Sequence, residues 1–213
     1  MGEKRGILLL RESTPMKRIC AAGKGRLDRK DERAAGAEEI LRAVKELTMK
    51  IRRAELSDLP EIMEIYDIAR GFMKENGNPT QWGHAYPPRE MIEEDIRQGC
   101  SYVWEGSEGL EGVFYFKEGE DPSYARIEEG AWLNEAPYGA IHRVASRGQK
   151  RGMLASCVEW CWQRCPNLKI DTHRDNHVMQ KALEKNGFVR CGKIYVEDGT
   201  SRIAYQKAEE GRR

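Results

Sequence analysis

The sequence has no apolar run that approaches the roughly 18 residues needed to span a bilayer. Residues 7–10 are apolar, but this stretch is too short even for the apolar segment of a secretory signal. An excess of one charge is also lacking, because 36 lysines and arginines balance 35 aspartates and glutamates. Such a chain has no overall field that would attract a nucleic acid or a membrane surface. We therefore expect a soluble cytoplasmic protein without nucleic-acid or membrane partners, in which any anion site is local.

The six cysteines include no C-x-x-C pair, which removes the common zinc and dithiol redox motifs. Cys157, Cys161 and Cys165 recur at every fourth residue and would share one face of a helix. Such a stripe could ligate a metal through thiolates, but free cysteine more often packs as a small hydrophobe. We expect these three side chains to lie in the core, and we expect no bound metal.

The composition changes near Met49. Residues 1–48 intersperse glycine with many charged side chains and few aromatics, which predicts a disordered or weakly helical extension, with one helix at 34–47. Met49 is a candidate for the natural start. A single domain is expected over residues 49–208, followed by a short tail at 209–213.

Hydrophobic periodicity from Met49 onward predicts the order β-α-α-β-β-β-α-β-α-β-β. Ser57 is expected to cap the first helix, with Pro60 in its first turn. These elements predict an α/β (α+β) fold in which helices cover a mixed sheet. The expected helices are 57–75, 89–98, 149–164 and 176–187, and the expected strands after the first are 100–106, 110–119, 140–145, 168–173, 188–196 and 202–207.

The stretch RVASRGQKRGML, residues 143–154, predicts a strand, a basic glycine-containing turn and the start of a helix. Amide groups at a helix start lack partners and favour an anion. Gly148 lets the turn tighten, and Gly152 removes a Cβ where a ligand must come close. Neither the G-x-x-x-x-G-K-[ST] motif nor the G-x-G-x-x-G motif is present, which weakens a nucleotide or dinucleotide hypothesis. Three side chains add local positive charge and favour a pyrophosphate ligand: Arg147, Lys150 and Arg151.

This turn resembles the [QR]-x-x-G-x-[GA] signature of the GNAT superfamily of acyl-CoA-dependent N-acyltransferases, which holds the coenzyme A pyrophosphate. The matching residues are Gln149, Lys150, Arg151, Gly152 and Met153, whereas Leu154 stands where glycine or alanine is usual. Leu154 would place a bulky side chain near the expected cofactor path. We expect either a local shift of the turn or weaker cofactor binding.

A second stretch, DNHVMQKALEKNGF, resembles the region of the same superfamily in which N-x-x-[AM] precedes G-F. Asn176, Met179, Gly187 and Phe188 occupy the matching positions. Many relatives carry a tyrosine four residues before that glycine as general acid on the thiolate, and this chain has Leu183 there. The resemblance covers about residues 49–207.

The resemblance implies a mixed sheet of about seven strands flanked by about four helices. It also implies an N-acetyltransferase that uses acetyl-CoA as cosubstrate, without metal, and acetylates an amine of a small molecule or protein by direct attack. A backbone N–H near Val144 would polarise the thioester carbonyl. The implied cofactor-binding residues are Val144, Ala145, Gln149, Lys150, Arg151, Gly152, Met153, Leu154 and Asn176.

The catalytic base is expected among His142, Asp171 and His173, with Glu128 or Glu129 as further candidates. The alternative for His142 is a partly buried histidine that is bonded across the sheet. Strand alternation places His142 and Arg143 on opposite faces, so only one of them should face the cleft.

Residues 171–176 combine polar groups at the carboxyl end of a strand, where open α/β sheets bind ligands. Their alternative role is helix capping by Asp175 or Asn176.

Trp82, Tyr86 and Trp132 lie in loops, where aromatic side chains can line an acceptor pocket or form lids packed on helices. Leu154 and Leu183 favour a rival hypothesis, a non-catalytic acyl-CoA-binding module with the same fold. Nucleotide binding is a third hypothesis. The acceptor is open, and a homodimer could form through edge strands.

Overall fold

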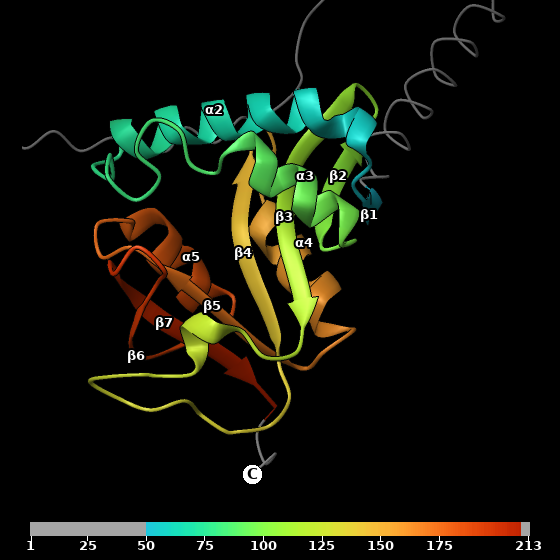
Figure 1. Ribbon diagram of the computed structural model, residues 1–213. Helices are drawn as coiled ribbons and strands as arrows, with labels where there is room; N and C mark the ends of the chain where they lie inside the picture. Colours follow the sequence, from blue (N-terminus) through green and yellow to red (C-terminus); the bar gives the residue numbers. More distant parts are fainter. Residues whose placement is uncertain (1–49, 210–213) are drawn as a thin grey trace, which may run out of the picture. The chain divides into compact units, whose positions relative to one another are not determined.

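The computed structural model describes residues 50–209 (Figure 1). The predictions for residues 1–48, for Met49 and for most of the tail lie outside the described residues. Within them, seven strands form one mixed sheet in the order β1-β2-β3-β4-β5-β7-β6, and four α-helices pack on it. The predicted fold class and order of elements are confirmed.

The elements lie within a few residues of their predicted bounds. The strands are β1 (Lys50–Arg53), β2 (Ser101–Gly106), β3 (Gly109–Glu118), β4 (Gly139–Ser146), β5 (Asn167–Thr172), β6 (Val189–Tyr195) and β7 (Ser201–Ala208). The helices are α2 (Leu59–Glu75), α3 (Arg89–Arg97), α4 (Met153–Trp162) and α5 (His177–Lys185), with short 3-10 helices η1 (Leu56–Asp58) and η2 (Pro122–Tyr124). No helix in this part of the chain is both long and apolar enough to cross a membrane.

The first helix begins differently from the prediction. Ser57 lies inside η1 and does not cap α2, which begins at Leu59. The Asp58 carboxylate accepts the N–H of Glu55 at 2.8 Å and pairs with Arg52 at 2.7 Å. The Asp58 carboxylate therefore stabilises the start of η1, and α2 begins without the side-chain cap that we expected of Ser57.

The parallel pair β4 and β5 is joined over only three residues, from Gly139↔Leu168 to Ile141↔Ile170. Beyond these pairs both strands continue, and they diverge toward their carboxyl ends (Figure 1). An opening at the carboxyl ends of diverging parallel strands is a common ligand-binding place in α/β proteins.

Apolar side chains fill both faces of the sheet. One core cluster joins the sheet to α4 and α5 and contains Cys157, Cys161 and Cys165, which are at most 9% exposed. Their predicted role in the core is confirmed. A second cluster joins α2 and α3 to the opposite face. The strands that form the opening are thus fixed from both sides.

Gly112 allows β3 to pack closely against β4. A Cβ at this position would lie 2.6 Å from the Trp104 ring and 2.7 Å from the carbonyl oxygen of Ala145. We expect Gly112→Ala to lower the free energy of unfolding by about 1–3 kcal/mol, because backbone and a buried ring cannot yield cheaply. Urea unfolding measures the change.

Gly71 in α2 provides the control, because a Cβ there meets no atom within 4 Å. Gly71→Ala is expected to raise the free energy of unfolding by up to about 1 kcal/mol through helix propensity. Equal stability of Gly112→Ala and the unchanged protein would contradict the close contact.

Candidate active site

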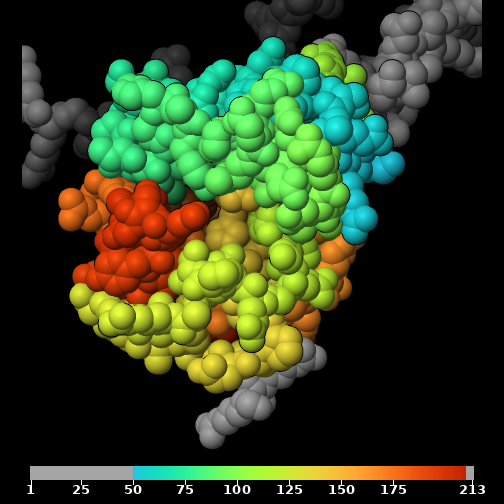
Figure 2. All heavy atoms as spheres, viewed as in Figure 1, coloured from blue at the N-terminus to red at the C-terminus, as the bar shows by residue number. Residues whose placement is uncertain are grey.

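A cavity of about 740 Å³ lies where β4 and β5 diverge. Its walls also include residues of α2, α3, the segment between those helices, and the turn between β6 and β7. Figure 2 shows the green residues around α2 and α3 above the red residues of β6 and β7, with gold residues of β4 visible between them. Elements that are distant in the sequence thus meet around one cavity.

A β-bulge in β4 determines which side chains reach the cavity. Val113 pairs with Ala145 and Tyr115 pairs with His142, so Phe114 alone faces two residues of β4, Arg143 and Val144. Arg143 has a φ of 51°, in the left-handed region. As a result His142, Arg143 and Val144 all line the cavity. The expectation that only one of His142 and Arg143 faces the cleft is wrong, because a bulge interrupts the alternation.

Three contacts hold Arg143 in this unusual conformation. Its Nη2 pairs with Asp95 of α3 at 2.6 Å, and both side chains are nearly buried. The Tyr66 hydroxyl donates to the Arg143 carbonyl at 3.2 Å, and the guanidinium lies 4.6 Å from the centroid of the Tyr115 ring. A left-handed non-glycine residue costs roughly 1–3 kcal/mol, so such a bulge persists only where its surroundings fix it.

His142 is held between two carboxylates. Its Nε2 lies 2.9 Å from Asp121 Oδ2, and its Nδ1 lies 3.6 Å from Asp171 Oδ1. Burial lowers the pKa of His142, but the hydrogen bond to Asp121 and the negative charges of both carboxylates outweigh it and raise that pKa to about 9. The imidazole is therefore protonated near neutral pH and is a poor proton acceptor there. This geometry matches the alternative interpretation of His142, a histidine bonded to its neighbours.

Asp171 has one oxygen free of protein partners. The Tyr124 hydroxyl donates to Oδ1 at 2.9 Å, and His142 also faces Oδ1. No hydrogen bond or ion pair from residues 50–209 reaches Oδ2, which is not one of the buried unpaired atoms either. Asp171 lines the cavity with a side chain that is 10% exposed, and Oδ2 is the oxygen left for a ligand. Asp121, in contrast, uses both oxygens, for His142 and for the N–H of Ser123.

The remaining candidates for a base lie outside the cavity wall. His173 Nδ1 accepts the N–H of Asp175 at 3.3 Å, and burial lowers the pKa of His173. Glu129 pairs with Lys193 at 2.7 Å, and Glu128 pairs with Arg126 at 2.6 Å.

The turn before α4 is open to a ligand. Gly148 and Gly152 have φ values of 76° and 84°, and a Cβ at either position would meet no atom within 4 Å. The amides of residues 148–152 donate no hydrogen bond to any described residue. These unpaired N–H groups and the following helix start suit an anion.

The positive charge of this turn is partly neutralised. Arg147 pairs with Glu61 at 3.1 Å and donates to the carbonyl of Leu110 at 2.8 Å. Lys150 pairs with Glu111 at 3.0 Å. Gln149 and Arg151 are exposed. The backbone, more than these basic side chains, is thus free to hold an anion.

Three apolar side chains on either side of the turn pack into the cores on the two faces of the sheet. Ala145 is buried in the core cluster on the α2 side. Met153 is buried in the cluster on the α4 side, and Leu154 packs partly against this same α4-side cluster. Their side chains therefore contribute to packing.

Asn176 caps α5, as one of the two interpretations predicted. Its Oδ1 accepts the N–H of Met179 at 3.1 Å, and its Nδ2 donates to Gln81 Oε1 at 3.0 Å. The same side chain lines the cavity. Capping and a place in the site are therefore compatible, and the bond to Gln81 ties the segment between α2 and α3 to α5.

Two of the three predicted acceptor-site aromatics line the cavity. Trp82 is buried and packs edge-on against Tyr66 at 5.6 Å, and Tyr86 is exposed. Trp132 lies outside the cavity wall, where it packs 5.4 Å from Tyr124 and Lys169 Nζ lies 4.1 Å from its ring centroid. Thr172, within the polar run 171–176, lines the cavity as well, whereas no periodic pattern or motif in the sequence marks Asp121 or the turn at residues 197–198.

The pKa of His142 makes the stability depend on pH. The folded value of about 9 lies above the ordinary 6.5, so protonated His142 stabilises the fold fully below about pH 6.5. This contribution is lost as the pH rises through about 9. We expect His142→Gln to lower the free energy of unfolding by about 3 kcal/mol at pH 6, because it leaves two carboxylates without their counter-ion.

The same variant should also flatten the decline in stability between about pH 7 and about pH 10. Urea unfolding at constant ionic strength measures both effects, with His84→Gln, at an exposed loop histidine, as control. A decline as steep in His142→Gln as in the unchanged protein would refute the assignment.

The fold and the cavity define a mixed α/β protein with an anion-binding turn and an adjoining polar cavity. Among solved structures, the GNAT-family acetyltransferase from Streptococcus agalactiae is 32% identical over 76% of this chain and 96% of that chain, with a TM-score of 0.68. This chain therefore belongs to the GNAT family of acetyltransferases.

Two further structures share the fold. A GNAT-family acetyltransferase from Listeria monocytogenes is 21% identical over 75% of this chain and 94% of that chain, with a TM-score of 0.56. A ribosomal-protein-alanine N-acetyltransferase from Brucella melitensis is 19% identical over 76% of this chain and 100% of that chain, with a TM-score of 0.51. Comparisons with family models and with curated proteins find no match.

Proposed function

We propose that the protein is an N-acetyltransferase that transfers the acetyl group of acetyl-CoA to an amine of a small molecule or a protein. The observation that carries this proposal is the free oxygen of Asp171 at the opening between β4 and β5. The 32% identity to the Streptococcus agalactiae acetyltransferase, over nearly its whole length, supports the same reaction.

The turn before α4 and the opening between β4 and β5 would bind different parts of acetyl-CoA. The amides of residues 148–152 and the start of α4 would hold the pyrophosphate, with Gln149, Lys150 and Arg151 alongside. The arm of acetyl-CoA that carries the acetyl group would lie between β4 and β5. There a backbone N–H near Val144 would polarise the thioester carbonyl. Asn176 would contact this arm from α5.

The acceptor amine must lose a proton to become nucleophilic. Asp171 Oδ2 would take that proton, directly or through a water molecule. His142 remains protonated and positions Asp171 and Asp121. The neutral nitrogen then attacks the thioester carbonyl carbon, the C–S bond breaks, and coenzyme A leaves as a thiolate, which takes up the second proton that the nitrogen loses when the amide forms. A thiolate is a good leaving group even without a proton donor, because thiols are far more acidic than alcohols or amines, so the apolar Leu183 does not prevent the reaction.

The turn can be tested by binding. Gly152→Ala places a Cβ in the open space over the turn, and we expect it to weaken coenzyme A binding roughly tenfold, which corresponds to about 1.4 kcal/mol. Calorimetric titration measures the affinity. Gly77→Ala is the matched control, because Gly77 has a φ of 82° and equally open surroundings at the end of α2.

Both variants should lose a similar stability, about 1 kcal/mol, from the left-handed backbone. Gly77→Ala should bind coenzyme A like the unchanged protein. Equal affinities for all three proteins would place the pyrophosphate elsewhere.

The base can be tested by turnover. We expect Asp171→Asn to lower kcat by about 100-fold, because the amide cannot accept the proton, and to leave coenzyme A affinity within about twofold. Thiol release from acetyl-CoA with a library of amines measures kcat, and Asp175→Asn, outside the cavity wall, is the control.

An unchanged kcat in Asp171→Asn would place the base elsewhere. Coenzyme A binding without turnover of any amine would instead favour the alternative function, a non-catalytic acyl-CoA-binding module.

A further inference from the structure

Acidic side chains outnumber basic ones on the cavity wall. Carboxylates come from α3, from the loop before η2, from β5 and from the turn between β6 and β7. The acidic residues are Asp95, Asp121, Asp171, Glu197 and Asp198, and the basic residues are His142, Arg143 and Arg202.

Most of the basic charge is already paired inside the protein. Arg143 pairs with Asp95 at 2.6 Å, and His142 lies between Asp121 and Asp171. The group of His142, Asp121 and Asp171 keeps one net negative charge, because one imidazolium faces two carboxylates. A cavity of this kind attracts cations and repels anions.

The turn between β6 and β7 adds a second negative site. Glu197 is exposed and forms no hydrogen bond or ion pair with any described residue. Asp198 accepts the N–H of Thr200 at 2.8 Å, and the nearly buried Arg202 is turned to Thr200 Oγ1 at 2.6 Å. Glu197 is therefore a carboxylate without a protein counter-ion at this part of the wall.

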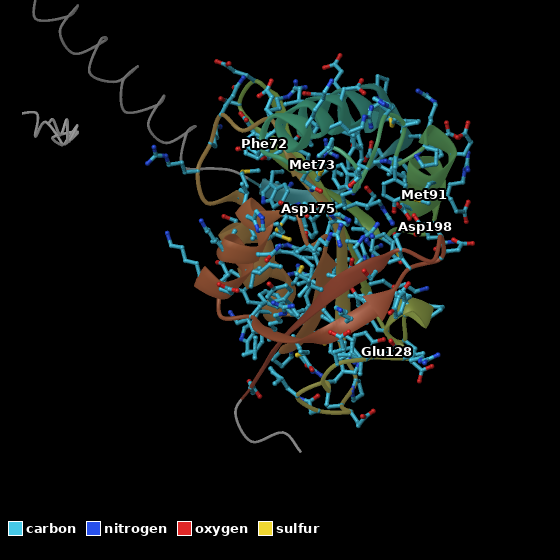
Figure 3. The ribbon with its side chains drawn as sticks, turned by 90° about the vertical axis from the view of Figure 1, so that its left-hand side faces the viewer. Phe72, Met73, Met91, Glu128, Asp175 and Asp198 are labelled. Carbon is cyan, nitrogen blue, oxygen red and sulfur yellow. The ribbon has the colours of Figure 1, made fainter. Side chains whose placement is uncertain are left out.

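Apolar and aromatic side chains accompany these carboxylates. Met73 of α2, Met91 of α3, Tyr115 and Trp82 line the same cavity. Figure 3 shows Met73 and Met91 on the helices and Asp198 on the turn of the β6–β7 hairpin, all at the side of the molecule that faces the viewer. Methylene groups can pack against such a wall, and aromatic rings also favour a cation.

Thr172 provides an independent sign of a polar ligand. It is 1% exposed, it lines the cavity, and its hydroxyl has no hydrogen-bond partner among the described residues. A buried hydroxyl without a partner costs free energy, so it is usually satisfied by a bound molecule or water. A polar atom of a molecule in the cavity would satisfy it.

From this arrangement we infer that the acceptor is a linear amine with a second positive charge, such as a diamine or the lysine side chain of a basic peptide. This inference rests on the proposed function. One ammonium group would lie at Asp171, the methylene chain would follow the apolar wall, and the second charge would lie at Glu197.

The reaction converts the first ammonium and the thioester into a neutral amide, the coenzyme A thiol and one proton. Acetylation therefore removes the charge that Asp171 attracts. The product keeps only the second charge, which favours its release after transfer.

The test compares kcat/KM for three acceptors of equal chain length: 1,5-diaminopentane, 1-aminopentane and 5-aminopentanoate. In the unchanged protein we expect the diamine to exceed the monoamine by about tenfold, the size expected for one charge pair, and the amino acid to be the poorest. Glu197→Lys should reduce the ratio of diamine to monoamine to about threefold or less. Glu108→Lys, at an exposed turn outside the cavity wall, should keep the ratio of the unchanged protein.

A monoamine or amino acid that matches the diamine would overturn the inference while acetyl transfer itself stands. A ratio that Glu197→Lys leaves unchanged would also overturn it. If no amine is acetylated, the proposed function fails, and calorimetric titration with 1,5-diaminopentane then decides the cation site. Binding that Glu197→Lys weakens supports this site, and absence of binding overturns it.

Discussion

The candidate site depends on the ion pair between Arg143 and Asp95. A left-handed residue in the middle of a strand is costly, and this pair anchors it to α3 while Tyr66 and Tyr115 hold its carbonyl and guanidinium. The resulting bulge turns consecutive residues of β4 toward one cavity. Without it, regular alternation would bury Arg143 or His142 on the opposite face. The architecture of the cavity thus follows from one strained position and the carboxylate that supports it.

Charge pairing also separates the roles of the polar residues. His142 is an attractive base when only its residue type is considered, but its two carboxylate neighbours keep the proton on its ring near neutral pH. The same pairing leaves Asp171 Oδ2 for a ligand. Ordinary pKa values would make His142 the base and Asp171 its partner. The surroundings of the two side chains favour the opposite roles, in which His142 positions the carboxylates and Asp171 accepts the proton.

The sequence predicts the order of strands and helices well, since hydrophobic periodicity and turn residues are local properties. It also predicts the glycine turn before α4, whose chemistry needs only adjacent residues. The bulge at Arg143 could not be predicted, because its cause, Asp95, lies 48 residues away in the sequence. Asp121 was missed for the same reason, since it meets His142 only through the fold. Trp132 shows the converse, because a loop aromatic with no periodic context can pack on a neighbouring tyrosine as readily as it lines a cavity.

The basic side chains of the turn before α4 have a further consequence. Arg147 and Lys150 already bind Glu61 and Glu111, so an arriving diphosphate meets amide dipoles and an exposed Arg151 rather than a cluster of unpaired cations. Ions in solution screen exposed charges strongly, whereas short hydrogen bonds from a fixed backbone are far less sensitive to them. Affinity at this turn should accordingly vary little with ionic strength, unlike that of phosphate sites assembled from mobile lysines and arginines.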